Sequence, residues 1–501
     1  MTLRVALVSA PISLEERYGG FAGAGNTEPT FALVCLAAVA RREGMDVRIV
    51  DAAAENLSIE QTAAELKEFR PRVVGISATT AGIVASGRLA ERLKESDAEV
   101  LTLIGGCHVT ALPEETLAEF PGFDVAVVGE GEETFGEILR AADNGGTVPG
   151  DLPGTAQRQN GRVLLNPRRP LIDDLDTLPL PAWELLRGFP GSFLPSPARM
   201  RRFPCASLVF ARGCPNQCRF CDRSVFGNKV RSYSPAYAVA MATDLADRFG
   251  VRELLIEDDT FILSAAWVRE FCARLIAAGT GISWSCLGRA DRVTPEILQQ
   301  MRAAGCWHIS YGIESGDQSI LDAMRKGESL ARIEDAVRWS REAGLKTKGF
   351  FMIGFPGETP ESLRRTKELA LRLPLDDISG MQVTPFPGTA LYACAAEYGA
   401  LAKDWRGMNT LSTVFVPRGF TREDLERARA ELLAAFYFRP AVLLRKGMAV
   451  LANPRLWVPM ARAFGVLLKI LGKRGGGRAH RRPRDRRRTG SPSDENAGKH
   501  E

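Results

Sequence analysis

Three cysteines carry the strongest chemical signal in this sequence. Cys214, Cys218 and Cys221 lie within residues 212–221 with the spacing Cys-x3-Cys-x2-Cys. Three thiolates this close together can bind three irons of a cubane iron–sulfur cluster and leave the fourth iron without a protein ligand. That fourth iron is then free to bind a substrate or a cofactor.

A single zinc ion is the alternative for these cysteines. Cys218 and Cys221 have a zinc-like spacing, and the distant His308 or Cys205 would complete four ligands. Zinc knuckles usually pair two short Cys-x2-Cys units, and the sequence has no second unit of this kind. The spacing therefore favours the iron–sulfur cluster.

The elements that must position the cysteines form a series of six β/α units. Apolar runs that predict strands cover residues 207–211, 253–257, 283–288, 308–313, 348–353 and 378–384. Helical or loop patterns follow each run. This series predicts a partial, open barrel over residues 205–390, in which an active site lies where the strands end.

An α/β domain with a doubly wound parallel sheet is predicted ahead of the barrel, over residues 1–145. Its apolar runs cover residues 5–8, 47–50, 73–76, 100–104 and 125–128. Ligands of such sheets bind beyond the carboxyl ends of the strands. Those ends carry Asp51, Ser77, Gly105-Gly106 and Gly129-Glu130-Gly131.

The remaining segments carry less chemistry. Residues 146–204 are predicted to be a proline-rich linker with at most a short hairpin, because ten of the 29 prolines fall within residues 149–204. Residues 391–472 are predicted to be helical, with a break at Arg439-Pro440. Residues 448–473 combine an apolar helical face with basic flanks, which predicts packing on the barrel or, as the alternative, peripheral contact with a membrane.

The net positive charge is concentrated at the end of the 501-residue chain. Lys and Arg exceed Asp and Glu by 65 to 60, and residues 473–501 alone hold ten basic and four acidic residues. We interpret this tail as disordered and expect no nucleic-acid partner. The sequence shows no signal-peptide pattern and no apolar run of 18 residues, so we expect a cytoplasmic protein with reduced thiols.

The cysteine loop resembles the signature of the radical S-adenosylmethionine (SAM) superfamily, and the likeness covers roughly residues 200–390. The resemblance implies that SAM chelates the open iron. One electron from a flavodoxin- or ferredoxin-type donor would then cleave SAM to a 5′-deoxyadenosyl radical. It also implies SAM contacts from Phe220, Arg289, Glu314, Gly354 and Gly357.

Four of the residues at the strand ends have open roles. An ordinary buried ion pair is the alternative for Arg289 and Glu314. Asp258 and Asp259 are candidates to face the substrate, because acids at a strand end are costly unless they are solvated or paired.

The first domain is similar to the cobalamin-binding domains of one large radical SAM branch. The resemblance implies a cobalamin site built from Ser77, Gly105, Gly106, His108, Gly129 and Glu130. The Asp-x-His-x-x-Gly motif of the methionine synthase type is absent after Asp51, so no lower histidine ligand is available there. His108 either touches the corrinoid or caps the turn that follows it.

Together these resemblances imply a cobalamin-dependent radical SAM enzyme that methylates an unactivated carbon of a small-molecule or lipid-like intermediate. The alternative resembles the anaerobic magnesium-protoporphyrin ester cyclase group, which oxidises or cyclises without methyl transfer. An RNA-modifying methylthiotransferase needs three N-terminal cysteines for a second cluster, whereas residues 1–200 contain only Cys35 and Cys107. A zinc-stabilised binding scaffold is the non-enzymatic alternative.

Overall fold

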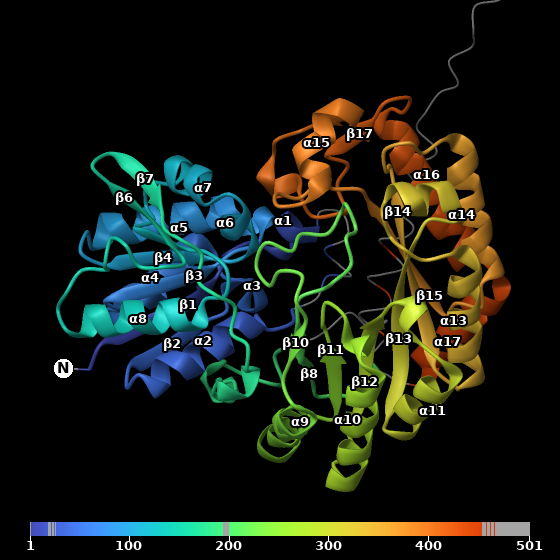
Figure 1. Cartoon of the computed structure of the whole chain (residues 1–501), viewed down its shortest axis with the longest axis horizontal. Coiled ribbons are helices and arrows are strands. Elements are labelled where there is room, and N and C mark those ends of the chain that lie inside the picture. Colours follow the sequence, from blue (N-terminus) through green and yellow to red (C-terminus); the bar gives the residue numbers. More distant parts are fainter. Residues whose placement is uncertain are drawn as a thin grey trace, which may run out of the picture.

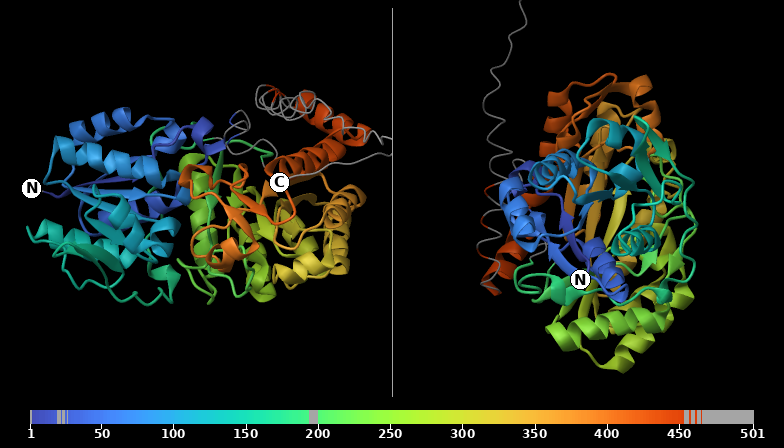
Figure 2. Two further views of the ribbon diagram at one scale, coloured as in Figure 1. Left: turned by 90° about the horizontal axis from the view of Figure 1, so that it is seen from above. Right: turned by 90° about the vertical axis from the view of Figure 1, so that its left-hand side faces the viewer.

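Two sheets lie side by side along the long axis of the molecule (Figures 1 and 2). The first has five parallel strands with a hairpin at one edge, and the second is fully parallel. The computed structural model describes residues 2–18, 22, 25, 27–193 and 200–452 and the single positions 457, 461 and 465. The predicted tail at 473–501 and most of the stretch 448–473 lie outside the described residues. No helix within the described ranges has the length and apolar character needed to span a bilayer.

The first sheet has the strand order β2-β1-β3-β4-β5-β6-β7. Its parallel strands are β1 (Arg4–Ser9), β2 (Asp46–Val50), β3 (Val73–Ser77), β4 (Leu101–Gly105) and β5 (Val125–Val127). The central strands are buried apolar runs because helices cover both faces of the sheet. On one face lie α2 (Phe31–Arg42) and α8 (Glu132–Asp143), and on the other lie α4 (Ile59–Phe69) and α5 (Ile83–Ser96). The prediction of a doubly wound sheet is confirmed.

A hairpin continues this sheet beyond residue 145. Strands β6 (Thr155–Gln159) and β7 (Arg162–Leu165) are antiparallel, and β6 pairs with β5. The rest of the predicted linker holds only the short helices η3 (Leu175–Thr177) and η4 (Trp183–Leu185) among its described residues. The short hairpin expected within residues 146–204 is therefore present, but the proline count carries no information about its pairing with β5.

The second sheet is an open, fully parallel half-barrel with the order β15-β14-β13-β12-β11-β8. Its strands are β8 (Cys205–Leu208), β11 (Glu253–Ile256), β12 (Ser283–Gly288), β13 (Cys306–Glu314), β14 (Lys346–Ile353) and β15 (Asp377–Gln382). The helices α9 (Pro235–Phe249), α10 (Ala265–Ala278), α11 (Pro295–Ala303), α13 (Leu330–Glu342) and α14 (Pro360–Arg372) cover its outer face (Figure 1). The predicted partial barrel is confirmed.

The first barrel strand ends earlier than its apolar run suggests. The Asp258 carboxylate accepts the backbone N–H of Phe210 at 2.6 Å, which draws the chain out of the ladder after Leu208. The chain then forms β9 (Ala211–Arg212), which pairs antiparallel with β10 (Arg231–Ser232). These two short strands hold the ends of the segment that contains the cysteines.

The C-terminal region packs between and beside the two sheets. It contains α15 (Ala390–Tyr398), β16 (Gly399–Leu401), η8 (Trp405–Gly407), β17 (Phe415–Pro417), α16 (Arg422–Tyr437) and α17 (Pro440–Ala452). The helical part and the break at Arg439-Pro440 agree with the prediction, and the pair β16–β17 adds a short antiparallel ladder. Strands of three residues are too short for a hydrophobic period to reveal them. The start of α17 contacts the barrel, where Arg445 donates to the Asp376 carbonyl at 2.9 Å.

Candidate active site

Cys214, Cys218 and Cys221 line a single cavity of about 650 Å³. Asp259 and Arg289, which follow β11 and β12, line the same cavity. Thr79, Thr80 and Cys107 of the first domain lie on its wall as well. The strand ends of the barrel and a loop of the first sheet therefore meet around the cysteines.

The cysteine loop is held from several sides. Gly213 has a φ of +86°, and a Cβ there would lie 2.4 Å from the Lys229 carbonyl, so the turn requires glycine. Its N–H donates to the Asp259 carboxylate at 3.0 Å. Further along the loop, the Arg219 N–H donates to the Met324 carbonyl at 2.9 Å. These bonds fix the loop before any metal binds.

The electrostatic environment favours the thiolate at one of the three sulfurs. A hydrogen bond from Cys221, and then the positive charges of Lys326 and Arg289, lower the pKa of the Cys218 thiol to about 6 although burial opposes the shift. The same hydrogen bond raises the pKa of Cys221, and burial adds to it. Iron binds the thiolate form of cysteine, and the positive charges of Lys326 and Arg289 favour that form at Cys218. Three cysteine sulfurs on the wall of one cavity fit a cluster with three protein ligands.

The other ligands required by the zinc alternative lie elsewhere. Cys205 begins β8, and His308 lies near the start of β13 beside Lys346. In a parallel sheet these amino ends lie at the edge opposite to the cysteine loop. Among the described residues, no three His, Cys, Asp or Glu side chains are grouped closely enough to bind one metal ion. The arrangement therefore does not support a single tetrahedral zinc.

Two of the predicted SAM residues belong to a buried charged network. Glu314 ends β13 with a left-handed backbone (φ +65°), and its carboxylate lies 3.5 Å from the Lys326 ammonium. Lys326 is also 3.5 Å from Glu328. Arg289 donates to Asp291 at 2.9 Å and to the Lys326 carbonyl at 2.9 Å. Arg289 and Glu314 are thus joined through Lys326 and do not form a direct ion pair.

Lys326 and Glu328 were missed by reasoning from the sequence. They lie in a loop 12 and 14 residues after Glu314, and no periodic pattern marks them. Both are almost fully buried, and one oxygen each of Glu314 and Glu328 has no hydrogen-bond partner among the described residues. That Glu328 oxygen still lies 3.5 Å from the Lys326 ammonium. A buried carboxylate oxygen without a hydrogen bond is costly, so the Glu314 oxygen indicates a place where a polar ligand binds.

The other predicted SAM residues lie outside the described cavity lining. Gly354 (φ +96°) and Gly357 (φ +89°) form a turn after β14, in which the Gly354 N–H donates to the Glu358 carboxylate at 2.6 Å. Burial raises the pKa of Glu358 to about 8. Phe220 is half-buried against the hydrophobic core. Of the five predicted SAM residues, Arg289 alone lines the cavity directly.

The two aspartates after β11 have different surroundings. Asp259 lines the cavity, where it accepts the N–H of Gly213. Asp258 is only 1% exposed and binds the backbone of Phe210, and burial raises its pKa to about 8. Of the two aspartates predicted to face the substrate, Asp259 therefore lies on the cavity wall, whereas Asp258 supports the backbone of Phe210.

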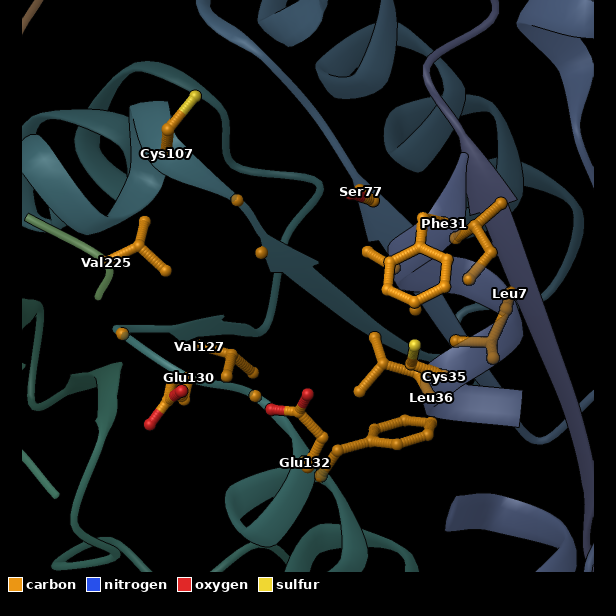
Figure 3. A pocket seen from close by; sticks show the side chains of 18 of the residues that line it. Leu7, Phe31, Cys35, Leu36, Ser77, Cys107, Val127, Glu130, Glu132 and Val225 are labelled. Atoms are coloured by element: carbon orange, nitrogen blue, oxygen red, sulfur yellow. The ribbon is translucent and has the colours of Figure 1, made fainter. Parts of the chain in front are cut away.

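A second cavity of about 320 Å³ lies at the carboxyl ends of β3, β4 and β5. Five of the six residues predicted to bind cobalamin line it: Ser77, Gly105, Gly106, Gly129 and Glu130. Figure 3 shows Leu7, Phe31 and Leu36 grouped on one side of the cavity, with Glu130 and Glu132 across from them. An apolar slot with a few polar groups fits the flat base at the end of the nucleotide tail of a corrinoid.

Gly106 and His108 follow β4 and have different surroundings. Gly106 has a φ of +118°, and a Cβ there would lie 2.3 Å from the Ala78 carbonyl oxygen. His108 is outside the described lining of both cavities. Its Nδ1 lies 3.4 Å from Thr80 Oγ1, and its ring contacts Trp405 edge-on at 4.9 Å. Burial lowers its pKa to about 4, so the ring is neutral at pH 7.

A buried ion cluster joins the two domains next to this second cavity. Arg212 of β9 donates to Glu130 at 2.9 Å and to Glu132 at 2.5 Å. Arg231 of β10 also donates to Glu130, at 2.7 Å. All four side chains are less than 10% exposed. Glu130 therefore holds the domains together as well as lining the cavity, and Arg212, Arg231 and Glu132 were not predicted.

The two cavities adjoin. Cys107, Val225 and Phe226 line both of them. Val225 and Phe226 come from the segment that follows the cysteines, and Cys107 follows Gly106 at the end of β4. The cysteine cavity therefore shares a wall with the predicted corrinoid site.

Models of two known domains match the chain. A B12 binding domain covers residues 20–139, and the Radical SAM superfamily covers residues 208–370. The chain is 34% identical to an uncharacterized methyltransferase of Pyrococcus horikoshii, over 84% of its own length and 90% of the relative's. The chain belongs to the B12-binding radical SAM enzymes.

Two other relatives differ from each other in activity. The chain is 28% identical to an anaerobic magnesium-protoporphyrin IX monomethyl ester cyclase of Cereibacter sphaeroides, over 85% of the chain and 69% of the relative. It is also 28% identical to the cytidylyl-2-hydroxyethylphosphonate methyltransferase of Streptomyces wedmorensis, over 71% of the chain and 76% of the relative.

Two solved structures share the whole fold. One is the radical SAM methyltransferase TsrM of Kitasatospora setae, with a TM-score of 0.67 at 18% sequence identity. The matched region covers 88% of this chain and 90% of the TsrM chain. The cobalamin-dependent radical SAM enzyme OxsB has a TM-score of 0.70 at 15% identity and covers 95% of this chain and 75% of its own. At this identity the likeness concerns the arrangement of the two domains.

Proposed function

We propose that this radical SAM enzyme is a cobalamin-dependent methyltransferase that adds a methyl group to an unactivated carbon of a small-molecule biosynthetic intermediate. The observation that carries the proposal is the shared wall of the two cavities, formed by Cys107, Val225 and Phe226. A substrate in the larger cavity would lie against the cysteine loop on one side and against the wall shared with the corrinoid site on the other.

The chain's own residues divide the work of binding. Cys214, Cys218 and Cys221 would hold a 4Fe-4S cluster. Arg289 and Glu314, with Lys326 between them, would bind the polar end of SAM. When bound, the cluster with SAM supplies a radical that removes hydrogen from carbon, and the corrinoid supplies a methyl group. The protein holds the substrate carbon close to both groups and excludes water.

The corrinoid site would be formed by the strand ends of the first domain. Ser77 can hydrogen-bond the nucleotide tail, and Gly105, Gly106 and Gly129 keep side chains out of its path. A flavodoxin- or ferredoxin-type protein in the cytoplasm would supply the electron.

An oxidative cyclase is the second candidate, because a cyclase relative is 28% identical over 85% of the chain. The two candidates differ in product mass. Methyl transfer adds one CH₂ to the product, whereas cyclisation removes hydrogen or inserts oxygen.

Anaerobic reconstitution with SAM, a reductant and candidate substrates tests the proposal. We expect 5′-deoxyadenosine and S-adenosylhomocysteine to form together with a product heavier by one CH₂. A product that gains no CH₂ while 5′-deoxyadenosine accumulates would favour the cyclase.

Replacing the cysteines tests the cluster assignment. Cys214→Ala, Cys218→Ala and Cys221→Ala should each abolish formation of 5′-deoxyadenosine, because each removes one iron ligand. Cys272→Ala is the matched control, since Cys272 lies in α10 outside the described lining of both cavities. Continued formation of 5′-deoxyadenosine in all three alanine variants would refute the assignment.

A further inference from the structure

Two side chains from different parts of the site point hydrogen-bond donors at one sulfur. Thr260 Oγ1 lies 3.2 Å from Cys214 Sγ, and Asn216 Nδ2 lies 3.2 Å from the same atom. We propose that Thr260 and Asn216 set the reduction potential of the cluster through the Cys214 sulfur. The proposal rests on the proposed function, because it requires a cluster bound at Cys214.

Both donors are held in place by the fold. Thr260 is 4% exposed and follows Asp259, whose carboxylate accepts the Gly213 N–H at 3.0 Å. The strand end that fixes the backbone beside Cys214 therefore also delivers the hydroxyl to its sulfur. The backbone carbonyl of Asn216 accepts a hydrogen bond from Arg223 Nη1 at 2.6 Å, which fixes the residue that carries the second donor.

The hydroxyl of Thr260 has two hydrogen-bond acceptors within reach, the Cys214 sulfur and the Asp259 carbonyl. Its oxygen also lies 2.7 Å from the Asp259 carbonyl oxygen, and a hydroxyl carries a single hydrogen. Hydrogen bonds to an ionised acceptor are roughly twice as strong as those between neutral groups. A Cys214 thiolate bound to iron is therefore the preferred acceptor, whereas the amide of Asn216 can donate to the sulfur without competition.

The direction of the effect follows from charge. Reduction adds an electron to the cluster and makes its sulfur ligands more negative, so a donated hydrogen bond stabilises the reduced state more than the oxidised state. Hydrogen bonds to the sulfurs are among the factors that set cluster potentials. Thr260 and Asn216 thus make the cluster easier to reduce. Because they act through Cys214, they are positioning residues and not catalytic residues.

The test compares the wild-type enzyme with Thr260→Val, Thr260→Ser and Asn216→Leu after anaerobic reconstitution. Valine keeps the shape of threonine without the hydroxyl, and serine keeps the hydroxyl. Iron and sulfide content establish that a cluster is present. The midpoint potential is then measured by dye-mediated titration, with the electron paramagnetic resonance signal of the reduced cluster as the readout.

We expect the ratio of reduced to oxidised cluster in Thr260→Val, at the wild-type midpoint, to fall about tenfold, which is a shift of about 59 mV downward for a one-electron couple. Asn216→Leu should shift in the same direction, and Thr260→Ser should stay within a factor of about two of the wild type. Equal midpoints in all four cluster-containing proteins would overturn the proposal but leave the proposed function intact.

Two other outcomes would contradict the proposed function and the tuning proposal, respectively. A wild-type protein that binds no cluster would refute the proposed function itself. A full cluster in Thr260→Ser with none in either Thr260→Val or Asn216→Leu would overturn the tuning proposal, because the donors would then be required for assembly.

Discussion

The backbone conformation of Gly106 and its close approach to Ala78 both require glycine at this position. Its φ of +118° is outside the range of ordinary L-residues, and a Cβ would lie 2.3 Å from the Ala78 carbonyl oxygen. The adjacent Gly105 has neither constraint, because a Cβ there would meet nothing nearer than 3.9 Å. The two glycines therefore have different reasons for being glycine, although the sequence presents them as one pair.

Alanine substitutions should separate these two reasons. Gly106→Ala should destabilise the protein by at least about 2 kcal/mol, because strain and a backbone clash add together. Gly105→Ala should change stability by less than about 0.5 kcal/mol and lower corrinoid retention, since its methyl group enters the cavity. Thermal denaturation of the apoprotein and cobalt content after reconstitution measure the two effects. Equal loss of stability in both variants would contradict the assignment.

At the residue scale, the sequence reveals a site whose residues are close together along the chain. It does not reveal contacts between side chains that are distant in sequence. Cys214, Cys218 and Cys221 are seven residues apart at most, so their spacing carries the chemistry. The contact of Arg212 with Glu130 spans 82 positions of sequence, and the sequence of a single chain contains no signal for it. The sequence likewise contains no signal for the contact of Glu314 with Lys326.

At the scale of elements, β9 and α8 are joined by the ion pair of Arg212 with Glu132. We expect Arg212→Met to destabilise the protein by about 3–5 kcal/mol, because it leaves Glu132 buried without a cation. Arg41→Met is the matched control: Arg41 pairs with Glu184, but its side chain is 51% exposed, so the cost should be about 0–1 kcal/mol. Thermal unfolding measures both. Similar thermal midpoints for the two variants would show that the buried ion pairs of Arg212 add no stability.

The contact between α6 (Cys107–Ala111) and η8 predicts a dependence of stability on pH. Burial lowers the pKa of His108 to about 4, against about 6.5 in an unfolded chain. Between these values the unfolded chain binds a proton that the folded protein does not bind. The free energy of unfolding therefore falls as pH drops through this window, by about 3 kcal/mol over its whole width.

A phenylalanine at this position tests that prediction. His108→Phe removes the titrating group and keeps an aromatic ring against Trp405. The thermal midpoint of the variant should decline less than that of the wild type between pH 6.5 and pH 5. Parallel declines would mean that His108 is protonated in the folded protein as readily as in the unfolded chain.

Most elements could be predicted because of how they are buried. The parallel strands are covered on both sides, so they appear as continuous apolar runs such as Val73–Ser77. The ladders β6–β7 and β16–β17 were harder, because three to five partly exposed residues show no clear period. The exit of β8 from the sheet depends on Asp258, which is distant in sequence.

At the scale of the molecule, the site exists only because the two domains meet. One continuous hydrophobic core includes Leu33 and Phe135 of the first domain and Leu208 and Phe210 of the barrel. The segment around η8 closes the junction, where Trp405 contacts His108. The sequence predicts both domains separately. It contains no periodic signal for the surface on which they join, so the shared wall of the two cavities could be found only in the structure.

The central claim is that one chain holds an iron–sulfur cluster and a corrinoid in adjoining cavities. Anaerobic reconstitution with iron, sulfide and a cobalamin, followed by metal and sulfide analysis of the desalted protein, tests it most directly. We predict about four irons and four sulfides with about one cobalt per chain. One zinc without sulfide, or a protein that retains neither iron nor cobalt, would contradict it.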